Sequence, residues 1–117
     1  MAVDRCPIEQ MVLDVGEPAF LRLARLFEAE TRDAVVEMRR RLAIADWREL
    51  GRQAHSLKHA TASFGLTELA AAAQAVEQAA DGGDAEAATW SMASLTDRTE
   101  ATIVEFTALI AEIARPA

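Results

Sequence analysis

Hydrophobic residues recur every three or four positions through most of this 117-residue chain, which is the spacing that predicts amphipathic helices. The clearest run predicts the buried face of a helix over 47–64, formed by Trp47, Leu50, Ala54, Leu57, Thr61 and Phe64. Asp46 precedes this run as the expected N-cap, and Gly65 follows it as the expected left-handed C-cap. The run therefore predicts one helix with well-defined ends.

Two helices are predicted before this run. Pro7 suits the first turn of a short helix, and Gly16 ends that helix. Glu17 and Pro18 then open a long helix that reaches the Asp46 cap. Its expected buried positions are Phe20, Leu23, Phe27, Ala34, Met38, Leu42 and Ala45.

Two more helices are predicted after the run. Thr67 is the expected N-cap of the first, which stops at the turn 81–83, and Asp84 is the expected cap of the second, which reaches about residue 113. Their expected buried positions are Leu69, Ala72, Val76 and Ala79, then Leu95, Thr102, Phe106, Leu109 and Ile113. The chain is thus predicted to be an all-α, antiparallel up-down four-helix bundle with a short extra N-terminal helix. We expect a single domain over 1–117, with a bundle core at about 17–113.

Composition and charge narrow the class of protein. No apolar run approaches the roughly 20 residues that span a bilayer, and the first residues lack the order of a secretory signal. A net charge of −7 argues against nucleic acid as a partner. We therefore expect a cytoplasmic protein with no membrane or nucleic-acid partner. We also expect it to be a monomer without a cofactor.

The charge is unevenly distributed along the chain. Residues 67–114 hold nine acids and a single base, whereas 46–66 hold three bases (Arg48, Arg52 and Lys58) and two acids. A less acidic segment of this kind suits contact with an acidic partner.

The most informative stretch is 54–65, which holds both histidines of the chain, His55 and His59, and its only lysine, Lys58. On a helical wheel, His55 lies roughly 130° from the centre of the apolar face, so its ring is expected to project into water. Lys58 follows at i+3, a neighbour on the same side of the helix. Gly51 and Ala62 keep the surroundings of the ring small, which would let another protein close over it.

An exposed imidazole beside a cation suits phosphoryl transfer. A neutral imidazole can attack phosphorus through one nitrogen while an acceptor holds the other and fixes the tautomer. A nearby ammonium offsets the negative charge of the phosphoryl oxygens. The residues therefore favour a group that accepts a phosphoryl and passes it on.

The stretch 55–65, His-Ser-Leu-Lys-His-Ala-Thr-Ala-Ser-Phe-Gly, resembles the signature of histidine-containing phosphotransfer (HPt) domains, and the likeness covers about residues 17–113. The resemblance implies a phosphoryl carrier and not an enzyme, working in a two-component phosphorelay. His55 would be phosphorylated, Lys58 would stabilise the phosphate, and Glu77 would orient the histidine. The implied partners are response-regulator receiver domains, which bring an aspartate and Mg²⁺, or a hybrid histidine kinase. The partner-docking face would include Arg48, Gly51, Arg52, Ser56, His59 and Ala62.

His59 departs from the family pattern, in which a glycine usually follows the lysine. A ring at this position is expected to reduce the number of partners that can dock, or to change the lifetime of the phosphoryl group on His55. We do not expect His59 to be a second acceptor, because no lysine stands at the matching spacing from it.

Two other functions are compatible with the pattern. His55 and His59 have the i, i+4 spacing of a zinc helix, but Ser56 replaces the glutamate of the HExxH motif and we expect no metal site. An HPt-like module could instead dock on a kinase or regulator without carrying phosphate. Acid-labile phosphate on His55 would separate that module from a phosphotransfer protein.

Overall fold

Five α-helices make up nearly all of residues 3–114, the part of the chain that this computed structural model describes. They are α1 (Arg5–Val15), α2 (Glu17–Ala43), α3 (Trp47–Ser63), α4 (Thr67–Asp81) and α5 (Ala85–Ile113). Residues 3–114 contain no strand. The two ends of the expected domain, 1–2 and 115–117, lie outside the described residues.

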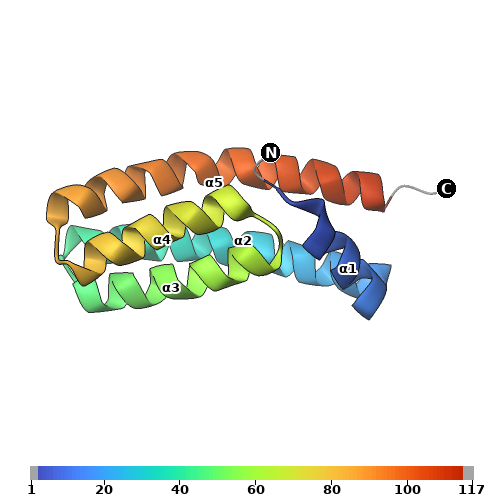
Figure 1. The fold of residues 1–117 in the computed structure, drawn as a ribbon, viewed down its shortest axis with the longest axis horizontal. Helices are drawn as coiled ribbons and strands as arrows, with labels where there is room; N and C mark the ends of the chain where they lie inside the picture. The colour runs from blue at the N-terminus through green and yellow to red at the C-terminus, as the bar shows by residue number, and fades with distance from the viewer. Residues whose placement is uncertain (1–2, 115–117) are drawn as a thin grey trace.

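Helices α2 to α5 run up and down as a bundle with overall dimensions of 50 × 22 × 19 Å (Figure 1). The long helices α2 and α5 extend past α3 and α4 at one end, and α1 packs against α2 there. The prediction of an all-α four-helix bundle with an extra N-terminal helix is confirmed. No helix within the described range is both long enough and apolar enough to cross a membrane.

The buried face of α2 differs in part from the predicted one. It consists of Phe20, Ala24, Phe27, Thr31, Val35 and Met38. Leu23, expected inside, is 43% exposed, because its position on the helical wheel lies at the border of this face. Ala45, also expected inside, lies in the turn after α2 with a φ of 56° and is exposed.

Three aromatic rings from different parts of the chain pack together within the bundle. Phe27 of α2 stacks on Phe64, the C-cap of α3, with ring centroids 4.2 Å apart. Phe106 of α5 meets both rings edge-on. The predicted apolar face of α3 is buried at Leu50, Ala54, Leu57 and Thr61, whereas its terminal members Trp47 and Phe64 are half-buried.

The short side chains of α4 bring that helix close to α3. Its buried residues are Leu69, Ala73, Val76, Ala79 and Ala80, while the predicted Ala72 is half-buried. The N-cap of α4 is Leu66, one residue before the predicted Thr67, and no side chain caps this end. In α5, Leu95, Thr102, Phe106 and Leu109 are buried as predicted, and Ile113 is half-buried.

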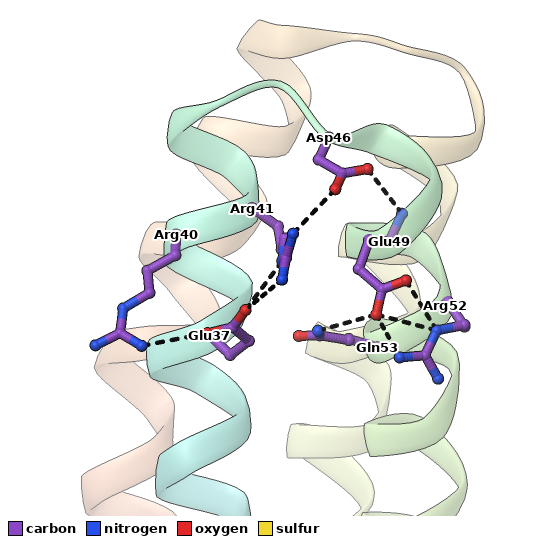
Figure 2. Close-up of polar contacts among 7 residues, drawn as sticks. All are labelled: Glu37, Arg40, Arg41, Asp46, Glu49, Arg52 and Gln53. Atoms are coloured by element: carbon purple, nitrogen blue, oxygen red, sulfur yellow. Dashed lines mark hydrogen bonds and ion pairs between the residues drawn. The ribbon is translucent and has the colours of Figure 1, made fainter.

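Side-chain caps start α3 and α5 as predicted. The carboxylate of Asp46 accepts a hydrogen bond from the backbone N–H of Glu49, and Asp84 caps α5 at Ala87 in the same way. Asp46 also accepts from Arg41 of α2, so its side chain ties the end of α2 to the start of α3 (Figure 2).

Gly65 ends α3 in the left-handed conformation, with a φ of 75°, as predicted. The structure adds a second constraint. The Gly65 carbonyl accepts a hydrogen bond of 2.6 Å from the backbone N–H of Asp4, so the chain before α1 lies directly on the turn between α3 and α4. A Cβ on Gly65 would collide with the Asp4 backbone.

We expect Gly65→Ala to lower the free energy of unfolding by about 1–3 kcal/mol, because alanine is strained at positive φ and would displace the Asp4 backbone. Gly82→Ala is the matched control: Gly82 caps α4 with a φ of −83°, and an added Cβ meets nothing closer than 3.6 Å. The control should match the wild type or gain up to about 1 kcal/mol. Urea denaturation measures both, and equal effects of the two substitutions would contradict this account.

Candidate functional site

His55 lies in the middle of α3, on the side away from the aromatic core. Its side chain is 53% exposed, as the helical wheel predicts. The preceding and following members of the α3 core, Ala54 and Leu57, are buried. The packing of α3 therefore fixes the direction in which the imidazole leaves the bundle.

Glu77 of α4 holds one nitrogen of this ring. Its Oε2 lies 2.7 Å from His55 Nδ1. An ionised carboxylate can only accept a hydrogen bond, so Nδ1 carries the proton and donates it to Glu77. The other nitrogen, Nε2, is then unprotonated and carries the lone pair whenever His55 is neutral.

Lys58 binds the second oxygen of the same carboxylate. Its Nζ donates to Glu77 Oε1 over 2.8 Å, and the Lys58 side chain is only 24% exposed. Lys58 is therefore a half-buried partner of Glu77. The three side chains form one network in which Glu77 is the shared acceptor.

The network keeps Glu77 ionised. The ammonium of Lys58, which donates to the carboxylate, lowers the pKa of Glu77 below its ordinary value, and the hydrogen bond from His55 acts in the same direction against the effect of burial. Glu77 thus carries its negative charge next to Nδ1 at neutral pH.

Gly51 does not lie on the exposed face where it was expected. It is buried one turn before His55, and a Cβ there would meet Asp81 Oδ1 at 3.2 Å and the Ala80 Cβ at 3.6 Å. The missing side chain lets α3 and α4 approach each other closely. Gly51 therefore serves the packing that brings Glu77 within reach of His55, and we leave it out of the docking face.

The other residues of the expected docking face are on the surface. Arg48, Arg52, Ser56, His59 and Ala62 are all exposed along α3. Arg52 is not a free cation, because it binds Glu49 in the preceding turn (Figure 2). This contact lowers the pKa of Glu49 to about 2. A partner would therefore meet an Arg52–Glu49 ion pair, in which the charge of Arg52 is largely neutralised.

His59 makes a contact that the sequence analysis did not predict. Its Nε2 lies 3.1 Å from Nε2 of His55, and the two rings meet edge to face with centroids 4.5 Å apart. The i, i+4 spacing places the two residues on neighbouring turns, but only the side-chain conformations bring these two atoms together. No group of three or more metal-binding side chains occurs in the described part of the chain.

The fold and the site define a helical bundle that displays a histidine whose Nδ1 is bound to a carboxylate. Comparison with known families gives a match to the Hpt domain over residues 22–115, most of the chain. The chain therefore belongs to the Hpt domain family, whose members are histidine phosphotransfer modules of two-component systems. Hpt domains are phosphoryl carriers that interact with response regulators and kinases. Searches of the curated proteins and of the solved structures found no significant match.

The lowered pKa of Glu77 predicts a pH-dependent contribution to stability. An acid with a lower pKa in the folded state stabilises the fold above its unfolded pKa, and this stabilisation is lost as the pH falls through the folded pKa. Glu77→Gln should therefore lower the free energy of unfolding at about pH 5–6, and the gap to the wild type should close as the pH is lowered further.

Denaturation by urea at a series of pH values measures that gap. Glu30→Gln is the control, since Glu30 is exposed on α2 and makes no hydrogen bond or ion pair among the described residues. Its stability should follow that of the wild type throughout. A Glu77→Gln gap that stays constant down to about pH 2 would contradict the assigned charge network.

Proposed function

We propose that this chain relays phosphoryl groups between the aspartates of receiver domains, with His55 as the acceptor. Membership of the Hpt domain family supports a phosphotransfer role. The observation that carries the proposal is the His55 ring itself, which is bound to Glu77 through Nδ1 at 2.7 Å and yet remains 53% exposed. A ring held in this way keeps one tautomer and offers Nε2 to a partner.

The transfer step follows from this tautomer. The Nε2 lone pair attacks the phosphorus of an aspartyl phosphate, a bond forms between Nε2 and phosphorus, and the bond between phosphorus and the acyl oxygen breaks. The aspartate leaves as a carboxylate with the electron pair, so no proton has to be removed from Nε2. The imidazole becomes positively charged and keeps its proton on Nδ1.

Glu77 and Lys58 each act on a charge that is present during this step. The Glu77 carboxylate faces the positive ring through Nδ1, which favours phosphorylation at Nε2. Lys58 balances the charge of Glu77 and adds a cation near the phosphoryl oxygens. The reverse step, transfer to a second receiver, uses the same groups because the phosphoryl group leaves along the path by which it arrived.

The proposed docking face consists of Arg48, Arg52, Ser56, His59 and Ala62. These residues lie along the exposed side of α3, on both sides of His55, and a receiver domain seated on them would place its aspartate opposite Nε2. We further propose that the protein acts as a monomer in the cytoplasm. The catalytic groups of the transfer would then belong to the partner.

A labelled phospho-receiver domain tests the acceptor. The wild type should gain phosphate that is labile in acid and stable in alkali, and His55→Gln should gain none. The substitution is at an exposed position, so both proteins should give the same far-ultraviolet circular dichroism spectrum. A wild type that binds receiver domains but never carries phosphate would be a docking module, and the proposal would be wrong.

Substitution of Lys58 tests the role of the cation. We expect Lys58→Ala to slow transfer by about 10- to 100-fold, because a charge-assisted hydrogen bond within the site is lost. Lys58→Arg retains a positive charge and should recover most of the rate. Rapid-quench kinetics with a phospho-receiver measures all three proteins, and an alanine variant as fast as the wild type would remove Lys58 from the mechanism.

A further inference from the structure

His59 covers the nitrogen that the proposed function needs. His55 Nδ1 is taken by Glu77, and among the described residues 3–114 the hydrogen-bond partner of His55 Nε2 is His59 Nε2 at 3.1 Å. Since Nε2 is the nucleophile, the space in front of it is where the phosphorus atom must arrive. The His59 ring, which meets the His55 ring edge to face with its Nε2 at hydrogen-bond distance, narrows that space.

The proton positions in this contact follow from the tautomer of His55. When His55 is neutral with its proton on Nδ1, its Nε2 can only accept a hydrogen bond. His59 Nε2 must then carry a proton and donate it to His55 Nε2. The lone pair that should attack phosphorus is therefore engaged by a neighbour in the resting protein.

We propose that His59 is a specificity-determining cap on the nucleophile, and this inference rests on the proposed function of His55. Phosphoryl transfer then begins with rotation of the His59 ring away from Nε2. The exposed position of His59 permits that rotation without rearrangement of the bundle. Partners that displace the ring as they dock gain full access to Nε2, whereas donors that make no contact with α3 reach it only in the uncapped fraction of molecules.

A small phosphoryl donor tests the cap without any partner. Phosphoramidate with a protonated nitrogen transfers its phosphoryl group directly: the Nε2–phosphorus bond forms, the phosphorus–nitrogen bond of the donor breaks, and the nitrogen leaves as ammonia with the electron pair of that bond. We expect His59→Ala to react with phosphoramidate about three to ten times faster than the wild type, because a hydrogen bond of ordinary strength no longer closes the site. Alanine also favours the helix, so α3 should persist.

Ser63→Ala is the matched control. Ser63 lies one turn after His59 on the exposed surface of α3, and its hydroxyl donates to the backbone carbonyl of His59. This variant keeps the His59 ring and should react at the wild-type rate. Rates are compared at about pH 8, where an ordinary imidazole is neutral.

Nitrogen NMR of the histidine rings provides a second readout. In His59→Ala, the ¹⁵N resonance of His55 Nε2 should move toward that of a free unprotonated imidazole nitrogen, while the Nδ1 resonance stays in place because Glu77 still binds it. A change confined to Nε2 reports loss of the cap and not a general change of structure.

The results of these experiments distinguish a failure of the His59 cap from a failure of the proposed phosphotransfer function. If the wild type and His59→Ala both carry phosphate on His55, and the variant shows neither the faster rate nor the Nε2 shift, the cap is wrong and the phosphotransfer function stands. If neither protein takes phosphate from phosphoramidate or from a phospho-receiver, the proposed function fails. A faster rate together with the Nε2 shift supports the cap.

Discussion

The carboxylate of Glu77 is the group on which the site depends, because both of its oxygens are used. One accepts from His55 Nδ1 at 2.7 Å and the other from Lys58 at 2.8 Å. The contact with His55 determines which imidazole nitrogen is unprotonated. The contact with Lys58 keeps the carboxylate ionised by lowering its pKa. A single acid on α4 thereby determines the tautomer of a histidine on α3.

The close packing of α3 against α4 places this carboxylate within reach of the imidazole. Small residues at the α3–α4 contact, Gly51 and Ala80 among them, let the two helices approach each other, and the approach brings Glu77 beneath the imidazole. The buried face of α3 turns His55 outward at the same time. Fold and site are thus linked through one helix pair, and Phe27 of α2 and Phe106 of α5 pack on Phe64 at the end of α3.

Much of this could be predicted from the sequence, and the failures have physical causes. Periodicity and caps predicted the five helices, and the i, i+3 spacing predicted that His55 and Lys58 share a side of α3. Glu77 came only from the family resemblance, because contacts between helices leave no local pattern. Gly51 was wrongly predicted to be exposed. A helical wheel gives the direction of a residue around its own helix, but it does not show which residues the neighbouring helix covers. The contact of His59 with Nε2 depends on side-chain rotamers, which spacing does not determine.

The central claim is that Nε2 of His55 is the nucleophile because Glu77 holds Nδ1. The position of the phosphoryl group on the ring tests this most directly, and ³¹P and ¹⁵N NMR of the phosphorylated protein can assign it. Phosphorus should be bonded to Nε2 of His55, with a proton still on Nδ1. Phosphorus on Nδ1, or on either nitrogen of His59, would contradict it.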